Sequence, residues 1–319
     1  MSTLRSSISP LFLDYKIELP YMKARKKAKG TKARVQAYKK RLGYIGTAIT
    51  VAILITVIVI SSFLIYSRLN SSPNQTSNKD QTVTSISMPP QAAIVDHLSL
   101  TYPNQTFIQT ATNTLKQAGY TVDYYPGEKV TVEFYRNLPT HGYRLIILRV
   151  HSSATWGADL KEAPVILFTS ERISRTRYIH EQLNDQLFWV SYTDEEAEKG
   201  ILYFGISPLF VTQSMNGRFQ NTTVIMMGCE GLDNPLMAKA FAEKGSKAYI
   251  SWNEPVLASH TDQATSHLLQ HLLIEKRTLE ESVQETFKEV GSDPAYKSLL
   301  VYYPPEVGEQ TIEDITDNP

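Results

Sequence analysis

The sequence contains one cysteine, Cys229, and this scarcity excludes a disulfide within the chain. It contains no Walker loop and no G-x-G-x-x-G, so nothing indicates a nucleotide site, and it lacks the G-x-S-x-G elbow of a serine hydrolase. We therefore expect no cofactor. A lone cysteine is either a small buried hydrophobe or a reactive thiol, so the residues around Cys229 have to be considered.

Charge is missing from a long stretch near the N-terminus, because no Asp, Glu, Lys or Arg occurs from 42 to 67. About 20 apolar residues are enough to cross the hydrocarbon core of a bilayer. Tyr44 and Tyr66 stand near the ends, where interfacial aromatic residues are typical. A cleavable signal peptide is the alternative, but the apolar core is long and no small-x-small cleavage site follows it. We predict one transmembrane helix over 44–67.

The formal net charge is zero, yet ten lysines and arginines lie between Lys23 and Arg41. A basic block beside a span places that side in the cytoplasm and can hold anionic lipid head groups. Nucleic acid is the other partner that such a run suggests, but next to a span a topology signal is favoured. We predict a single-pass membrane protein with a basic cytoplasmic tail over 1–43, an extracytoplasmic C-terminal domain, a membrane-lipid partner and no nucleic acid.

The segment 68–90 is polar, rich in Ser, Thr and Asn, and closed by two prolines, which is typical of a flexible stalk. A folded domain is predicted over 91–303, followed by an acidic tail over 304–319. Asn-x-Thr sequons, which are glycosylated only outside the cytoplasm, begin at Asn74, Asn104 and Asn221.

From residue 91 strands and helices alternate, which predicts an α/β domain with helices on both faces of a mainly parallel sheet. Apolar runs predict strands at 92–95, 121–125, 144–150, 165–169, 201–206, 209–213, 224–227 and 248–252. Helical spacing predicts helices at 107–118, 130–138, 235–244, 262–274 and 279–290. Since no helical pattern separates 201–206 from 209–213, we expect an antiparallel hairpin there. The polar stretch 171–199 is interpreted as a surface excursion.

The thiol lies in the turn of a predicted strand–turn–helix–strand unit from 222 to 252. The turn is Gly228-Cys229-Glu230-Gly231, and its two glycines allow a sharp bend and the close approach of a substrate backbone. Open parallel sheets bind their ligands at the carboxyl ends of the strands, which is where Cys229 lies.

A histidine occupies the equivalent place after another predicted strand, because His151 directly follows Arg144–Val150. If the two strands are neighbours, His151 and Cys229 emerge at one edge within reach of each other. An imidazole can stabilise a thiolate or remove the thiol's proton, and can later protonate a leaving amine. The backbone N–H groups of Cys229 and Ser152 are the candidate donors to an oxyanion.

A His closing one core strand and a Cys closing the next, with Cys-x-Gly at the thiol, resembles the caspase-like fold of clan CD cysteine peptidases. That group includes caspases, gingipains, legumains, separases and CHAT-domain proteins, and the segment 236–273 is particularly similar to the gingipain and CHAT pattern. The resemblance covers 91–290. It implies a three-layer caspase-like sandwich, a polypeptide substrate, and a dyad of His151 and Cys229 that cleaves peptide bonds on the carboxyl side of a selected residue.

The chain departs from that family in two respects. The family usually has Gly directly after the histidine, whereas this chain has Ser152, and the separation of His151 from Cys229 exceeds that in caspases, which the excursion 171–199 accounts for. The family's acidic pair and specificity pocket map onto no particular residues. The acidic residues left unassigned are Asp159, Glu162, Glu171 and Glu230.

Other interpretations of the same residues stay open. His151 can be a strand-end histidine bonded to backbone and Cys229 a packing residue, in which case the domain is a catalytically inactive caspase-like surface module that binds a partner. His267 and His271 are spaced i, i+4 on a helix and can ligate zinc, but no third ligand has motif spacing, so a solvated helix face is favoured and no metal is expected.

Overall fold

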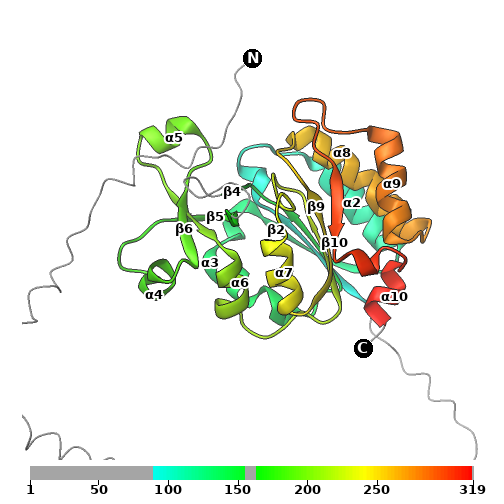
Figure 1. Cartoon of the computed structure of the whole chain (residues 1–319), viewed down its shortest axis with the longest axis horizontal. Coiled ribbons are helices and arrows are strands. Elements are labelled where there is room, and N and C mark those ends of the chain that lie inside the picture. Colours follow the sequence, from blue (N-terminus) through cyan, green and yellow to red (C-terminus); the bar gives the residue numbers. More distant parts are fainter. Residues whose placement is uncertain (1–88, 155–162, 318–319) are drawn as a thin grey trace, which may run out of the picture. The chain divides into compact units, whose positions relative to one another are not determined.

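The structure, a computed structural model, describes residues 89–154 and 163–317 (Figure 1). The predicted cytoplasmic tail and transmembrane helix, and the stalk up to residue 88, lie outside these residues. Within the described ranges no helix is long and apolar enough to cross a membrane.

A six-stranded sheet forms the centre of the domain, in the order β10-β9-β8-β3-β1-β2. Its strands are β1 (Gln91–Asp96), β2 (Thr121–Pro126), β3 (Leu145–Arg149), β8 (Thr222–Met226), β9 (Ser246–Trp252) and β10 (Leu300–Tyr303). All neighbours are parallel except β10, which pairs antiparallel with β9. The prediction of an α/β domain with a mainly parallel central sheet is confirmed.

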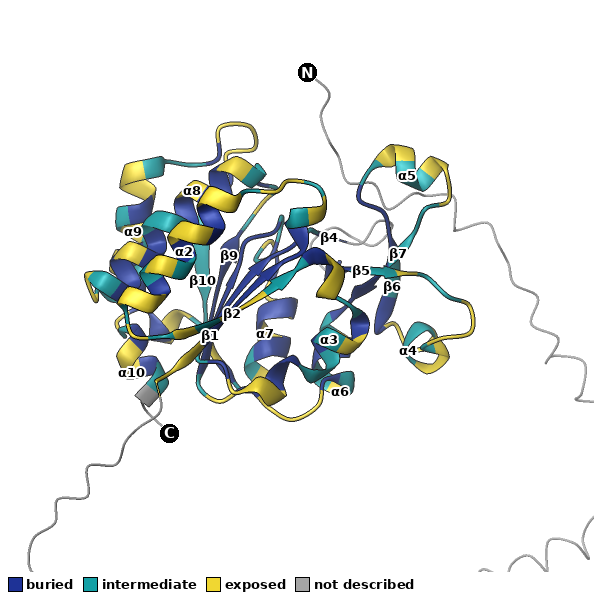
Figure 2. Ribbon diagram, turned by 180° about the vertical axis from the view of Figure 1, so that it is seen from behind, coloured by how far each residue is buried: buried dark blue, intermediate teal, exposed yellow. Residues whose placement is uncertain are grey.

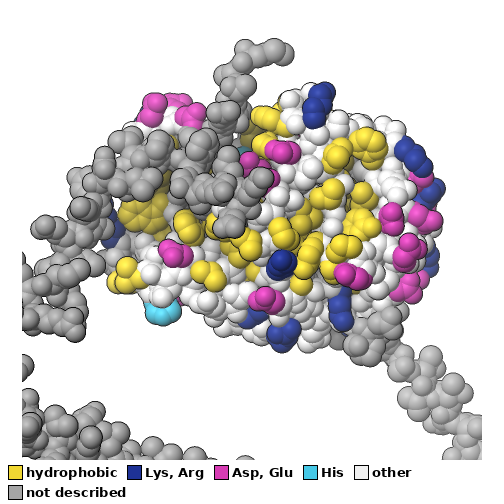
Figure 3. Space-filling model, viewed as in Figure 1, with side chains coloured by type: hydrophobic (Ala, Val, Ile, Leu, Met, Phe, Trp, Pro, Cys, Tyr) yellow, Lys and Arg dark blue, Asp and Glu magenta, His cyan; other side chains and the backbone are white. Residues whose placement is uncertain are grey.

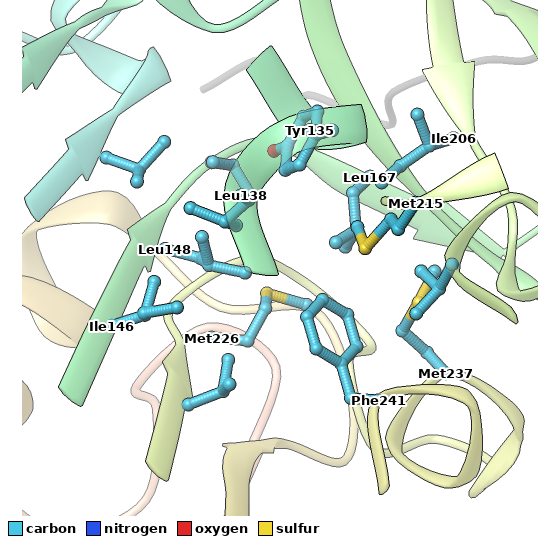
Figure 4. Close-up of a cluster of buried hydrophobic side chains, with 14 of the residues drawn as sticks. Tyr135, Leu138, Ile146, Leu148, Leu167, Ile206, Met215, Met226, Met237 and Phe241 are labelled. Atoms are coloured by element: carbon cyan, nitrogen blue, oxygen red, sulfur yellow. The ribbon is translucent and has the colours of Figure 1, made fainter. Parts of the chain in front are cut away.

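Helices cover both faces of this sheet (Figures 1 and 2). On one face lie α3 (Val132–Asn137), α6 (Pro208–Ser214) and α7 (Leu236–Glu243), and on the other α2 (Gln105–Gln117), α8 (Ala258–Leu269) and α9 (Leu279–Val290). Because successive strand residues point to opposite faces, Ile146 and Leu148 of β3 join the first cluster, while Leu145 and Ile147 join the second. Figure 4 shows the first cluster, where Leu148 and Met226 lie near Phe241 of α7. A strand buried on both faces needs an almost continuous apolar run, which the sequence supplies.

A smaller antiparallel sheet follows β3 in the chain, with the order β4-β5-β7-β6. Its strands are β4 (Ser152–Ala154), β5 (Val165–Arg172), β6 (Leu187–Val190) and β7 (Tyr203–Ile206). The stretch 171–199 is therefore more than a surface excursion, since β6 lies within it, between α4 (Ile179–Leu183) and α5 (Asp194–Glu198). The acidic residues of α5 do lie at the surface (Figure 3).

The predicted strand at 209–213 is wrong, because these residues belong to α6. Ser207 caps this helix, its hydroxyl accepting from the N–H groups of Leu209 and Phe210, and Pro208 occupies the first helical position. Ser207-Pro208 is a sequence signal for a helix N-terminus, and here it outweighs the strand that the apolar run 209–213 suggests. β7 pairs antiparallel with β5 and β6 instead.

The predicted acidic tail over 304–319 is also wrong in its boundary. After a 3-10 turn (Pro305–Val307), α10 (Ile312–Asp317) packs on the face of the sheet that α2 and α8 cover, and Ile312 and Ile315 are buried there. Apolar residues spaced three apart among the acidic ones are enough to dock a short helix. The folded domain thus extends through residue 317.

Candidate active site

The two residues predicted to form a dyad stand at the same level of the sheet. β3 pairs in parallel with β8, and the last register pair is Leu148 with Met226. His151 and Cys229 each lie three residues beyond that pair, at the carboxyl ends of adjacent strands. The two segments touch, because the Ser152 hydroxyl donates to the backbone carbonyl of Cys229 at 2.6 Å. The predicted adjacency of the two strand ends is confirmed.

The glycines of the thiol turn are required by close packing. A Cβ on Gly228 would lie 2.3 Å from Ser152 Oγ and 2.5 Å from the Val150 carbonyl oxygen, and one on Gly231 would lie 2.1 Å from Ser251 Oγ. Neither glycine has a positive φ; in this turn the left-handed residue is Glu230, with φ of 60°. Gly228 thus allows the histidine strand end to approach the cysteine turn.

The imidazole of His151 sits among aromatic rings, partly exposed. Its ring centroid lies 5.7 Å from that of Tyr192 and 5.8 Å from that of His97, and Tyr102 and Phe168 are 6.0 Å away. Nε2 shares a hydrogen bond of 2.9 Å with Thr101 Oγ1. Burial, aided by the positive charge of Arg149, lowers the pKa of His151 to about 4. The imidazole is therefore neutral at pH 7 and able to accept a proton.

The thiol of Cys229 faces the other neighbouring strand. Its sulfur donates to the Val256 carbonyl at 3.6 Å and lies 3.5 Å from the Val256 nitrogen, beside the buried cluster of Trp252 and Ala264. Burial is the main cause that raises the pKa of Cys229 to about 11, and the charges of Glu230 and Asp293 add to it. At pH 7 the group is a neutral thiol.

The side chains of the pair have different hydrogen-bond partners. Among residues 89–154 and 163–317, His151 bonds to Thr101, Cys229 bonds to Val256, and no hydrogen bond joins the two side chains. Catalytic hydrogen bonds are often long before substrate binds. The arrangement provides a neutral base and a neutral nucleophile at one edge, without a preformed ion pair.

The two proposed oxyanion donors lie on the facing segments. The Phe168 N–H donates to the His151 carbonyl, so in the β4–β5 ladder the next residue, Ser152, belongs to a non-hydrogen-bonded pair and its N–H points away from β5. Ala154, two residues on, points the same way and donates to Glu230 Oε2 at 2.7 Å. In the described part of the chain the Cys229 N–H has no backbone acceptor, and its hydrogen bond to its own sulfur opposes the rise in the pKa of that thiol. Both amides are thus placed at the cysteine turn.

Three buried charges, which the sequence reasoning missed, hold this edge together. Arg149, the last residue of β3, makes a fork of 2.7 and 2.8 Å with Asp262 of α8 and bonds to Asp96 of β1 at 2.7 Å. Burial opposes its charge, but these carboxylates outweigh burial and raise the pKa of Arg149. Arginine in an otherwise apolar strand was the available signal, since a buried arginine requires partners.

The neighbouring residue of α8 anchors the other strand ends. The Thr261 hydroxyl donates to the Met227 carbonyl at 3.1 Å and accepts from Trp252 Nε1 at 2.9 Å. The first turns of α8 therefore fasten the ends of β1, β3, β8 and β9, and so fix both His151 and Cys229.

The unassigned acidic residues have separate fates. Glu230 accepts from the Ala154 amide. Glu171 accepts from the Val132 N–H at 3.2 Å and forms an ion pair with Arg177 at 2.6 Å. Asp159 and Glu162 lie outside the described residues.

The interpretation of His267 and His271 as a solvated helix face is wrong for His271, which is 4% exposed and packs between α8 and α9.

A comparison with models of known protein families and a search of curated proteins both found no match to this chain.

Proposed function

We propose that this chain is a membrane-anchored cysteine endopeptidase with a caspase-like domain. The observation that supports this function best is the register of two adjacent parallel strands, which places the partly exposed His151 and Cys229 at one level of the sheet. The contact between Ser152 and the Cys229 carbonyl keeps the two strand ends together. A peptide is the substrate class, because the resemblance to clan CD peptidases implies it.

The chemistry follows from the two neutral side chains. In the tautomer whose Nε2–H donates to Thr101 Oγ1, Nδ1 of His151 carries the lone pair and takes the thiol proton while the sulfur of Cys229 attacks the scissile carbonyl. The oxyanion accepts from the amides of Ser152 and Cys229. When the C–N bond breaks, the imidazolium gives the proton to the leaving amine. Water, deprotonated by His151, then hydrolyses the thioester and regenerates the thiol.

The first test is the removal of the sulfur. In Cys229→Ala, hydrolysis of fluorescein-labelled casein by the full chain in detergent is expected to disappear, because no nucleophile remains. Folding is expected to survive, with a cost of about 1 kcal/mol or less in unfolding free energy. Wild-type turnover that persists unchanged in Cys229→Ala would exclude the dyad.

A second candidate function is favoured by the state of the thiol. The Cys229 thiol donates a hydrogen bond to the Val256 carbonyl, and burial raises the pKa of this thiol. The described residues contain no hydrogen bond between the thiol and His151. These features also suit a caspase-like surface module that has lost activity and binds a partner. No casein or peptide-library hydrolysis by the wild type, together with a well-folded domain, would favour this module over the peptidase.

The membrane topology is proposed from the basic block before the apolar stretch 44–67. With the C-terminal domain outside, protease added to intact cells is expected to degrade it, and detergent is expected to be needed for cleavage of the basic tail. A C-terminal domain that is degraded only after the cells are opened would reverse the orientation.

A further inference from the structure

Three side chains that the candidate active site does not use converge where α8 meets α9. His267 belongs to α8, His271 to the π-helical turn (Gln270–Ile274) that continues it, and Glu289 to α9. Their ligand atoms all lie within 4.8 Å of one another. Glu289 Oε2 is 2.5 Å from His267 Nδ1 and 3.1 Å from His271 Nε2.

A second carboxylate fixes the orientation of the His271 ring. Glu275 Oε2 lies 3.1 Å from His271 Nδ1, and Arg277 Nε donates to the same oxygen at 2.7 Å. A neutral imidazole has one N–H, so if Nδ1 donates to Glu275, the lone pair of Nε2 faces the carboxylate of Glu289. Two acceptors 3.1 Å apart repel unless a cation or a proton lies between them.

We propose that His267, His271 and Glu289 form a binding site for a divalent transition-metal ion of the zinc type. Two imidazoles and one carboxylate suit zinc, whereas magnesium and calcium prefer oxygen ligands. Ligand atoms around a tetrahedral zinc ion lie roughly 3.3 Å apart. The three ligand atoms lie within 4.8 Å of one another, and the side chains of His267 and Glu289, which are 42% and 43% exposed, have room to rotate toward that spacing. Glu275 acts as the carboxylate that orients a metal-bound histidine.

The ion would tie α9 to the C-terminal part of α8. The N-terminal part of α8 carries Thr261 and Asp262, which hold the ends of the strands at the candidate active site. The π-helical turn at 270–274 supports this assignment, since such turns concentrate at functional sites. The expected role is structural, because the ligands lie beyond the turns of α8 that bond to Arg149 and Met227 at the strand ends.

Zinc titration of the full chain in detergent tests the site. Calorimetry with ZnCl₂ is expected to show one ion per chain, and His267→Asn and Glu289→Gln are each expected to weaken it by roughly 10-fold or more. His180→Asn, at an exposed histidine on α4, is the matched control and should bind as the wild type. Zinc at 100 times its Kd should raise the Tm by roughly 5–10 °C, and MgCl₂ should not.

Both variants are expected to fold, because the side chains of His267 and Glu289 are partly exposed and neither substitution removes a buried group. A loss of zinc binding in either variant therefore reports on the site and not on unfolding. Wild-type zinc affinity in both His267→Asn and Glu289→Gln would mean an ion bound elsewhere. No binding by the wild type at about 100 µM zinc would mean that a proton, and not a metal, joins these side chains. Either result would overturn the site, and neither depends on peptidase activity.

Discussion

Replacing Asp262 by alanine is expected to lower the free energy of unfolding by about 3–5 kcal/mol, the largest stability loss that we predict for this chain. The substitution removes both oxygens of the fork on Arg149 and leaves a buried guanidinium with Asp96 as its one remaining carboxylate. Asn104, whose Nδ2 donates to Asp262 at 2.9 Å, also loses its acceptor. Asp96 still balances the charge of Arg149, so the cost arises mainly from buried N–H donors of Arg149 and Asn104 that lose their acceptor where water cannot replace it.

Urea unfolding of the full chain in detergent measures this loss, followed by the fluorescence of Trp252 in a background in which the other two tryptophans, Trp156 and Trp189, are replaced by phenylalanine. Trp252 is buried and bonded to Thr261, directly beside Asp262, so it reports on this end of the sheet. Arg149→Lys keeps the charge but not the planar fork and should lose less than Asp262→Ala. Lys199→Ala breaks an exposed pair with Glu195 and should leave the midpoint unchanged. A loss below about 1 kcal/mol for Asp262→Ala would show that these charges are solvated.

The network also shows where sequence reasoning ends. The apolar run before His151 predicted β3 correctly, because burial on both faces leaves a local pattern. No local pattern predicts that Arg149 pairs with Asp262, because Asp262 lies on a helix more than 100 residues later. The leucines of that helix predict its apolar face but not the partner of Asp262. Glu289 escaped for the same reason. It joins His267 only because α9 packs against α8, and no spacing motif encodes that packing.

The candidate site was predictable up to the strand ends and no further. Strand periodicity and the glycines around Cys229 placed His151 and Cys229 at one edge, and the parallel register agrees. The direction of each side chain depends on neighbours contributed by other strands. Thr101 after β1 holds the imidazole, and Val256 after β9 holds the thiol. Sequence patterns fix the backbone at such positions better than they fix contacts with distant loops.

The second large effect concerns the separate roles of His151 and Cys229. His151→Asn is expected to reduce peptidase turnover by roughly 10²- to 10⁴-fold and to leave the rate of Cys229 alkylation unchanged. Turnover falls because the variant has no base to remove the thiol proton. Alkylation is unaffected because in the described residues the sulfur is bonded to Val256 and not to the imidazole. A preformed thiolate–imidazolium pair predicts the opposite, a reactive thiol that His151→Asn silences.

Iodoacetamide labelling measures this directly, since Cys229 is the only cysteine and each adduct reports on it alone. With its pKa raised to about 11 from an ordinary 9, the native thiol should react about 100-fold more slowly at neutral pH than it does in the urea-unfolded chain. Labelling should be measured between about pH 6.5 and 9, where the fold is most stable. Below pH 6.5 the imidazole of His151 is protonated in the unfolded chain, whereas in the folded chain its lowered pKa keeps it neutral down to about pH 4. The free energy of unfolding therefore falls as the pH falls from 6.5 to 4.

Above pH 9 the unfolded state releases a thiol proton that the folded state keeps, so stability falls again in alkali. Within the window both groups stay neutral, and the labelling rate should rise about tenfold per pH unit without a plateau, because the thiolate fraction does. If the labelling rate instead reaches a plateau below pH 8, and His151→Asn abolishes that plateau, the two side chains form a thiolate–imidazolium ion pair and not a neutral pair. Unchanged labelling together with unchanged casein turnover in His151→Asn would remove the histidine from the chemistry altogether.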